Sequence, residues 1–280
     1  MVERYLLPII GNVPLEKLGL ADLDGCYASL TRKGLSPRTV RYVHSILRSA
    51  LNGAMRSDLI YRNPAAYATL PKSVKTERAF LDPEQSARFL RAAEEDEWSA
   101  LWQLLLSTGM RPSEALALKW TDLKDDALTV QRAIVPREDG GWGFDTPKSG
   151  RTRVIPLDLV SLAALRATRK AQAVNRMALG DQCDDHGLIF TRSGAPLDLQ
   201  LLRRRNFARI VKRAGLDPKL TPYSLRHSHI SALLSEGISV SLVAERVGHA
   251  STKMTLDTYA HVSSADRRAV VDVLNKLARS

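Results

Sequence analysis

Apolar residues recur every three or four positions near the N-terminus, the spacing of one face of an α-helix. The repeat consists of Val40, Val43, Ile46, Leu47 and Ala50. Ser36 and Pro37 come just before it and are typical of a helix start, because serine caps the first turn and proline fits its backbone angles. We expect residues 1–70 to form a small helical domain.

A polar, charged stretch without apolar periodicity follows this domain. It covers residues 71–79, and we interpret it as a linker between two domains. Beyond it, Asp82, Pro83 and Gln85 occupy the cap, first-turn and capping-box positions of a new helix. Residues 80–280 are therefore expected to form the second domain.

The second domain combines many helical patterns with two short strand-like stretches. The strand-like stretches are residues 128–135 and 152–155, and they bracket turns at residues 140–141 and at Lys148. Helices are expected at residues 82–95, 98–107, 158–178, 198–214, 225–235 and 240–247. The sequence therefore predicts a mainly α fold with a small antiparallel β-sheet, divided over two domains.

The chain is strongly basic. Its 41 lysines and arginines exceed its 30 aspartates and glutamates, which gives a formal net charge of +11 and a pI near 9.9. Such a charge suits a protein that meets a polyanion such as nucleic acid. Ribosomal and membrane-surface proteins share this property, so charge alone does not choose among these classes.

Cysteine usage and hydropathy indicate an intracellular protein. Cys26 and Cys183 are far apart and lack the spacing of a metal site, and two isolated thiols suit a reducing compartment. The N-terminal residues lack the pattern of a signal peptide, and no run approaches the roughly 20 apolar residues of a membrane-spanning helix. We expect a cytoplasmic location and no membrane partner.

A tyrosine near the C-terminus points to a specific chemistry. Tyr259 follows a Gly248-His249 pair, and Arg226 lies upstream in a Leu-Arg-His segment, a set that suits attack by tyrosine on a phosphodiester. A free tyrosine has a pKa near 10, so holding it as phenolate at pH 7 costs about 4 kcal/mol, which neighbouring groups must supply. Arginine is planar and always cationic, and it matches two non-bridging oxygens of the attacked phosphate at once.

A second arginine and a lysine extend this set. Arg111 lies where one helix-like run ends at Gly109 and another starts at Pro112. Glu114, three residues after Arg111, can hold the guanidinium in one orientation. Lys148 stands near the tip of a turn rich in proline and glycine, and a lysine in that place can reach a leaving oxygen.

The order Arg, Lys, Leu-Arg-His, Gly-His and Tyr resembles the tyrosine recombinases, also called the phage integrase family. The matching segments are residues 108–114, 146–149, 221–227 and 247–261. Each segment is weak alone, but their order and spacing together are highly specific, and the resemblance covers nearly the whole chain. It implies a core-binding domain and a catalytic domain in a site-specific DNA recombinase of phage or mobile-element integration and excision.

The mechanism that follows from this resemblance gives each residue one role. Tyr259 attacks the scissile phosphate while Arg111 and Arg226 hold its non-bridging oxygens. Lys148 protonates the departing 5′ oxygen, and His249 hydrogen-bonds the phosphate or the nucleophile. Because one phosphodiester is exchanged for another, a 3′-phosphotyrosyl link, we expect no ATP, no cofactor and no metal.

Tyr223 departs from the family pattern, which usually has histidine three residues before the second arginine. A phenol can donate a hydrogen bond to a phosphate oxygen, but near pH 7 it is a poor proton acceptor compared with imidazole. The general base is therefore open: Tyr223 stabilises phosphate charge while His249 or the phosphate itself handles the proton, or Tyr223 has its own adapted role. Tyr223 is also the alternative nucleophile to Tyr259.

Seven further arginines are candidates for DNA contact. They are Arg38, Arg41 and Arg48 in the first domain and Arg151, Arg203, Arg204 and Arg205 in the second. Burying such charges unpaired would cost several kcal/mol, so they face either nucleic acid or solvent, and a solvated helix face is the alternative interpretation.

The resemblance also implies partners. It implies double-stranded DNA with specific sites, a first domain that grips the far side of the duplex, a homotetramer on that DNA, and accessory DNA-bending or directionality factors. An amphipathic helix expected at residues 265–277 either packs on its own domain or docks into a neighbouring protomer. Many integrases carry a further N-terminal arm-binding domain, and the sequence leaves open whether this chain is a fragment or a short member.

Two other functions fit the same residues. A type IB topoisomerase-like enzyme would nick and reseal DNA by the same chemistry without strand exchange, and the core-binding-like domain argues against it. A non-catalytic DNA-binding protein of the same fold is disfavoured by the complete set of candidate catalytic residues, and only Tyr223 favours it.

His227 and His229 could suggest a metal site, but residues two apart on a helix point in different directions. The target sequence and the direction of the reaction do not follow from the sequence.

Overall fold

The structure is a computed structural model of the 280-residue chain. It describes residues 1–72, 79–137, 140–147, 150–179, 186–192 and 194–259, with the side chains of residues 178–179 and 257–259 left aside. The chain divides into two compact units, Met1–Glu77 and Arg78–Ser280. Most of the residues predicted to form the linker, and the whole predicted helix at 265–277, lie outside the described residues.

The first unit consists of helices and helical turns. They are η1 (Val2–Leu6), α1 (Leu7–Ile10), η2 (Leu15–Lys17), α2 (Leu20–Arg32), α3 (Pro37–Arg56) and η3 (Pro64–Tyr67). Helix α3 begins as predicted, because the Ser36 hydroxyl accepts a hydrogen bond from the Thr39 amide at 3.2 Å. Its apolar stripe packs with that of α2 in the core of this unit, where Tyr27 hydrogen-bonds His44 at 3.1 Å.

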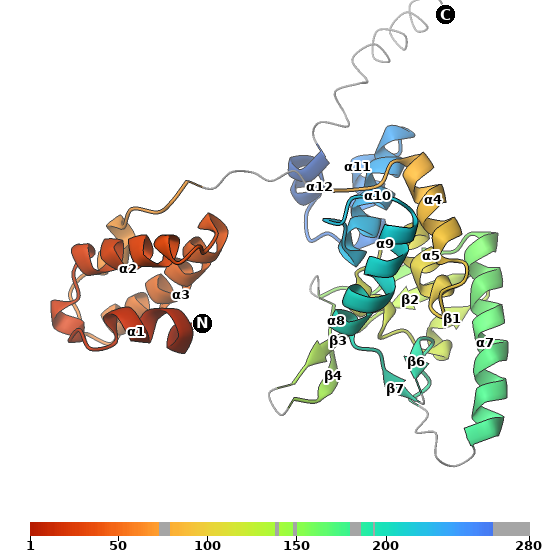
Figure 1. Cartoon of the computed structure of the whole chain (residues 1–280), viewed down its shortest axis with the longest axis horizontal. Helices are drawn as coiled ribbons and strands as arrows, with labels where there is room; N and C mark the ends of the chain where they lie inside the picture. Colours follow the sequence, from red (N-terminus) through yellow and green to blue (C-terminus); the bar gives the residue numbers. More distant parts are fainter. Residues whose placement is uncertain (73–78, 138–139, 148–149, 180–185, 193, 260–280) are drawn as a thin grey trace, which may run out of the picture. The chain divides into compact units, whose positions relative to one another are not determined.

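The second unit contains the remaining helices, of which α5 and α10 lie among the others and α7 runs along one side (Figure 1). The longer ones are α4 (Pro83–Ala93), α5 (Ser99–Thr108), α7 (Leu159–Leu179), α10 (Pro222–Ser235), α11 (Val240–Val247) and α12 (Thr252–Tyr259). Asp82 and Gln85 form the predicted capping box at the start of α4. Within the described part of the chain, no helix is both long and apolar enough to span a membrane.

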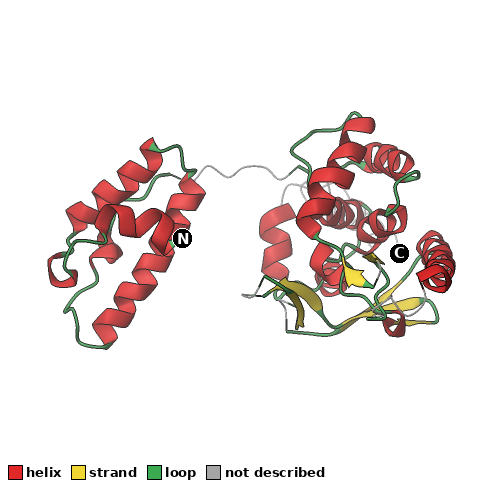
Figure 2. Cartoon of the chain, turned by 60° about the horizontal axis from the view of Figure 1, so that its bottom comes forward, coloured by secondary structure: helices red, strands yellow, loops and turns green. Residues whose placement is uncertain are grey.

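The strands of this unit are short and antiparallel, and most of them lie toward its lower side in Figure 2. One sheet has the order β1 (Leu123–Lys124), β2 (Ala127–Val130) and β5 (Arg153–Pro156). The other strands form two hairpins, β3 (Ala133–Pro136) with β4 (Trp142–Asp145) and β6 (Thr191–Arg192) with β7 (Ala195–Pro196). The predicted fold class, mainly α with small antiparallel sheets, is confirmed.

The expectation of one strand over residues 128–135 was wrong. The segment breaks after Val130, and its two halves belong to different sheets. The buried carboxylate of Asp122 accepts hydrogen bonds from the side chains of Gln131 and Arg132. These two residues therefore interrupt the strand between Val130 and Ala133. The alternation of apolar residues in the sequence does not reveal this interruption.

A similar local change affects the predicted helix at residues 198–214. It is built from three consecutive pieces, α8 (Leu199–Leu202), the π-helical η6 (Arg203–Phe207) and α9 (Ala208–Arg213). The carboxylate of Asp96 supports it from outside, since it accepts hydrogen bonds from Asn206 at 3.0 Å and Arg209 at 2.8 Å. The same carboxylate also accepts from the indole of Trp102.

We predict that Asp96→Ala lowers the free energy of unfolding of the second unit by about 2–4 kcal/mol, because the buried indole of Trp102 loses its acceptor and Asn206 keeps only a longer contact with Glu97. All four tryptophans lie after residue 78, so tryptophan fluorescence during urea unfolding of the full chain reports on this unit. Glu95→Ala is the matched control: it breaks the exposed Glu95–Arg213 pair and should cost less than about 1 kcal/mol. Equal losses for both variants would contradict the structural role of Asp96.

Candidate active site

The end of α5 places the first candidate arginine. Gly109 terminates the helix in the left-handed region, with φ of +62°, a conformation that favours glycine. Arg111 follows as the N-cap residue of α6 (Pro112–Ala115), and Glu114 reaches back to it. The Glu114 carboxylate accepts one hydrogen bond from the Arg111 amide at 2.9 Å and one from its Nη1 at 2.7 Å. The predicted orienting role of Glu114 is therefore matched by the geometry of its side chain.

A third arginine shares the same carboxylate. Arg153 in β5 donates from Nη2 to Glu114 Oε2 at 2.6 Å, and the side chain of Glu114 is fully buried. Burial by itself would raise the pKa of Glu114, but the hydrogen bonds and positive charges of Arg153 and Arg111 lower it below the ordinary value. The buried anion therefore holds two cations beside each other.

Sequence reasoning did not single out Arg153 as part of the site. The sequence does contain a signal. Arg153 and Ile155 are two residues apart in a strand, so their side chains lie on the same face, and Ile155 is fully buried. An arginine on the inward face of a strand needs a partner, and here the partner is Glu114.

The second candidate arginine comes from the middle of α10. Arg226 is 5% exposed, and its Nη1 donates to the carbonyl oxygen of Gly109 at 2.8 Å. This contact fixes Arg226 against the turn that leads into Arg111. The fold thereby brings together two arginines that are far apart in the sequence.

His249 lies in the turn after α11. Gly248 ends that helix with φ of +70°, and its carbonyl oxygen accepts a hydrogen bond from Arg111 Nη2 at 3.3 Å. A side chain on Gly248 would lie 2.8 Å from Arg153 Nη1, so glycine also makes room for the third arginine. Burial, followed by the charges of Arg226 and Arg111, lowers the pKa of His249 to about 4. His249 is therefore a neutral imidazole at pH 7.

The helix that carries Tyr259 is attached to His249. His249 Nδ1 lies 2.7 Å from the hydroxyl of Thr255 in α12, and Thr255 is fully buried. Tyr259 ends this helix, one turn after Thr255, although its side chain lies outside the described residues. Thr255 was not singled out from the sequence, since an isolated threonine in a helical segment carries no signal of its own.

The other predicted catalytic residues are placed differently. Lys148 lies outside the described residues. Tyr223 is in the first turn of α10, three residues before Arg226, and is 44% exposed. Its exposed position suits contact with a bound phosphate and does not decide between the roles considered for it.

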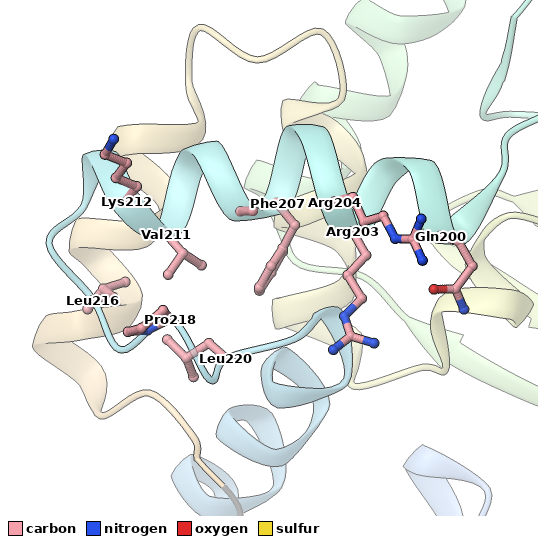
Figure 3. Close-up of a pocket in the computed structure, with 10 residues that line it drawn as sticks. Gln200, Arg203, Arg204, Phe207, Val211, Lys212, Leu216, Pro218 and Leu220 are labelled. Atoms are coloured by element: carbon pink, nitrogen blue, oxygen red, sulfur yellow. The ribbon is translucent and has the colours of Figure 1, made fainter.

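The predicted DNA-contacting arginines are all exposed: Arg38, Arg41, Arg48, Arg151, Arg203, Arg204 and Arg205. Arg203 and Arg204 line a pocket of about 790 Å³ together with Gln200 and Lys212. Figure 3 shows apolar side chains that extend from the helical segment carrying Arg203 and Arg204 toward Pro218 and Leu220. Their contact with DNA stays a prediction.

His229, one of the two histidines of α10, has partners within the protein on both ring nitrogens. His229 uses Nδ1 to contact the carbonyl oxygen of Leu106 at 3.0 Å and Nε2 to contact Arg246 at 3.3 Å. Across the residues that the structure describes, no group of three or more His, Cys, Asp or Glu side chains could hold a metal ion.

We predict that Glu114→Gln destabilises the second unit by about 3–5 kcal/mol at pH 7, because the part-buried guanidiniums of Arg111 and Arg153 lose their buried anion. The pKa of Glu114 is lower in the folded than in the unfolded protein, so its contribution is complete above the unfolded pKa and is lost as pH falls through the folded one. The gap between wild type and Glu114→Gln should therefore shrink as the pH falls below about 4.5. Urea unfolding followed by tryptophan fluorescence from pH 7 to pH 3.5 measures it, and a constant gap would contradict this account.

Comparisons with known proteins identify the family of this chain. The model of the phage integrase family matches residues 79–266. An integrase of Streptomyces ambofaciens is 31% identical over 269 residues, which cover 92% of this chain and 68% of that protein.

Solved structures have the same fold. The Tn1549 transposon integrase in complex with a circular intermediate DNA superposes with a TM-score of 0.81 at 23% identity, covering 97% of this chain and 92% of that one. A lambda integrase tetramer bound to a Holliday junction superposes with a TM-score of 0.66 at 21% identity, covering 88% and 65%. The resemblance inferred from the motifs is confirmed, and the chain belongs to the phage integrase family of tyrosine recombinases.

Proposed function

We propose that this protein is a site-specific DNA recombinase that breaks and rejoins DNA strands through a 3′-phosphotyrosyl intermediate made by Tyr259. One observation carries the proposal: Arg111, Arg226 and His249, which lie far apart in the sequence, meet around the turns at Gly109 and Gly248. Membership of the tyrosine recombinase family supports the same reaction.

The arginines suit stabilisation of a phosphate under attack. Negative charge grows on the non-bridging oxygens in the transition state, and cations already fixed in place need no reorganisation to meet it. Glu114 fixes Arg111 while the arginine side chain keeps 16% of its surface exposed. The site thus holds positive charge in a set orientation and leaves Arg111 accessible to substrate.

His249 acts in this proposal as a neutral hydrogen-bonding group. When the Thr255 hydroxyl donates to Nδ1, the ring proton lies on Nε2 and can be donated to a phosphate oxygen or to the nucleophile. The low pKa of His249 follows from burial and neighbouring arginines, and it makes the protonated imidazolium a minor form at pH 7. The proton of Tyr259 then passes to the phosphate or to His249, the two acceptors that the sequence left open, while Tyr223 stabilises phosphate charge or has its own adapted role.

Lys148 and Tyr259 complete the reaction. Tyr259 forms the bond to phosphorus, the 5′ oxygen leaves, and Lys148 gives that oxygen a proton. The 5′ hydroxyl of another strand reverses the step and restores a phosphodiester. Bond energy is conserved throughout, so the proposed reaction uses neither ATP nor a cofactor.

The proposed partner is double-stranded DNA carrying recombination sites. Solved relatives support this, since the Tn1549 integrase is seen with circular intermediate DNA and lambda integrase as a tetramer on a Holliday junction. We infer a homotetramer on DNA, a first unit that grips the duplex through Arg38, Arg41 and Arg48, and accessory DNA-bending factors. A cytoplasmic location follows from this role.

Loss of the Tyr259 hydroxyl is expected to abolish covalent DNA attachment. Wild-type protein and Tyr259→Phe are incubated in EDTA with nicked suicide duplexes pooled from the sequence that flanks the gene, and adducts that resist SDS are counted on a gel. Wild type should form an adduct and Tyr259→Phe should not, because phenylalanine has no nucleophile.

Each other result has a distinct meaning. An adduct in the Tyr259→Phe variant would move the nucleophile elsewhere, with Tyr223 tested next by Tyr223→Phe. DNA binding by wild type without any adduct would overturn the catalytic proposal in favour of a non-catalytic DNA-binding protein.

The arginine pair at the pocket of Figure 3 is expected to contribute to phosphate binding. Combined Arg203→Gln and Arg204→Gln should reduce the slope of log affinity against log salt by up to about 2, at roughly 0.9 for each phosphate that the variant no longer neutralises. Arg213→Gln is a control on the same helical segment, because its guanidinium already pairs with Glu95. Fluorescence anisotropy with a labelled duplex at several salt concentrations measures the slopes, and equal slopes for the double variant and wild type would contradict the proposed binding.

A further inference from the structure

The C-terminal end of α5 needs hydrogen-bond donors. The last four carbonyl groups of a helix have no partner within it. The Gly109 amide satisfies Leu105 at 3.1 Å, which leaves the carbonyls of Leu106 and Ser107 to other groups. This helix end comes directly before Arg111, so the groups that hydrogen-bond to it also determine the position of Arg111.

His229 supplies one of the donors from α10. It is 8% exposed, and its Nδ1 lies 3.0 Å from the carbonyl oxygen of Leu106. A carbonyl oxygen only accepts, so the ring hydrogen is on Nδ1 and Nε2 is a bare acceptor. Arg246 Nε points at that acceptor from 3.3 Å. Burial, and then the charge of Arg246, lowers the pKa of His229 to about 4, which keeps the ring neutral at pH 7.

Arg246 connects this helix end to two other segments. Its Nη2 lies 3.3 Å from the carbonyl oxygen of Ser107 and 3.3 Å from that of Pro156 at the end of β5. Its own carbonyl oxygen accepts a hydrogen bond from Arg153 Nε at 3.0 Å. Arg246 stands in the last turn of α11, two residues before Gly248. Its contacts therefore hold α5, β5 and the start of the His249 turn together.

The ring of His229 also packs against Gly109. A side-chain carbon added to that glycine would lie 2.5 Å from the ring Cδ2 atom of His229. The carbonyl oxygen of Gly109 is the acceptor for Arg226, which stands one turn before His229 on the same helix. The His229 ring therefore limits where Gly109 can lie, and the position of Gly109 in turn determines the hydrogen bond that Arg226 makes.

We propose that His229 and Arg246 form a positioning pair, which fixes the Gly109 and Gly248 turns relative to each other and thereby sets Arg111, Arg226 and His249 for phosphate contact. Both ring nitrogens of His229 have partners inside the protein, so the residue acts through others and does not touch substrate. The proposal rests on the proposed recombinase function. It extends that function by two residues to which the mechanism gives no role.

The first test replaces His229 with phenylalanine. His229→Phe keeps a ring against Gly109 and removes both hydrogen bonds. Single-turnover adduct formation on the wild-type suicide substrate should slow by about 10- to 100-fold, the scale of a small misplacement of catalytic groups. Affinity for the same duplex should stay unchanged. Leu165→Ala, a buried change in α7, controls for loss of stability and should slow cleavage little at a temperature where both variants are folded.

A charge-neutral substrate separates positioning of the arginines from a general structural defect. A methylphosphonate at the scissile position lacks one anionic oxygen and so depends less on Arg111 and Arg226. The rate deficit of His229→Phe should be smaller on this substrate than on the phosphate. An equal deficit on both substrates would indicate a structural role only and would overturn the proposal.

A double-mutant cycle with Arg246→Met tests whether the residues act as a pair. Residues that act through each other give a double variant that is less impaired than the product of the two single deficits. Multiplicative deficits, or a His229→Phe rate equal to wild type, would overturn the pair while leaving the recombinase function intact. Absence of any adduct from wild-type protein would instead overturn the proposed function, and the positioning proposal with it.

Discussion

Repulsion among arginines is the constraint on which the active-site arrangement depends. Arg111, Arg153 and Arg226 all contribute to the field that lowers the pKa of His249, and like charges this close destabilise a fold unless something compensates them. Glu114 compensates two of them from a fully buried position. Carbonyl oxygens at the ends of helices compensate others, because that end of a helix carries partial negative charge.

In the proposed function, the same compensation prepares the site for a phosphate. A guanidinium that is already held by a carboxylate or a carbonyl loses little freedom when an anion arrives. The excess of cations over anions remains, so a phosphate diester would complete the charge balance that the protein leaves incomplete. His249 stays neutral in that field, so the hydrogen bond that the proposed mechanism assigns to it adds nothing to the repulsion.

Local chemistry explains why several elements could be predicted. Ser36 and Asp82 mark the starts of α3 and α4 through contacts within three residues, and such contacts are encoded in the segment itself. The prediction for residues 128–135 failed because the side chains of Gln131 and Arg132 hydrogen-bond to the buried carboxylate of Asp122, and the strand is interrupted at these two residues. The hairpin of β6 and β7 was not predicted, since two-residue strands are too short to show a period.

The sequence by itself determined the family and the mainly α fold, and it supplied the predicted catalytic residues, whose types and order suit the chemistry of phosphodiester exchange. Only the tertiary structure decided how those residues are held. Arg153 became part of the site through its pairing with Glu114, Thr255 through its contact with His249, and His229 through the open carbonyl of Leu106. Two of these partnerships, Arg153 with Glu114 and His229 with Leu106, join segments distant in the chain, whereas His249 and Thr255 are six residues apart, in the turn after α11 and in α12. The type of a hydrogen-bonding side chain does not identify its partner, because the partner is set only when the chain folds.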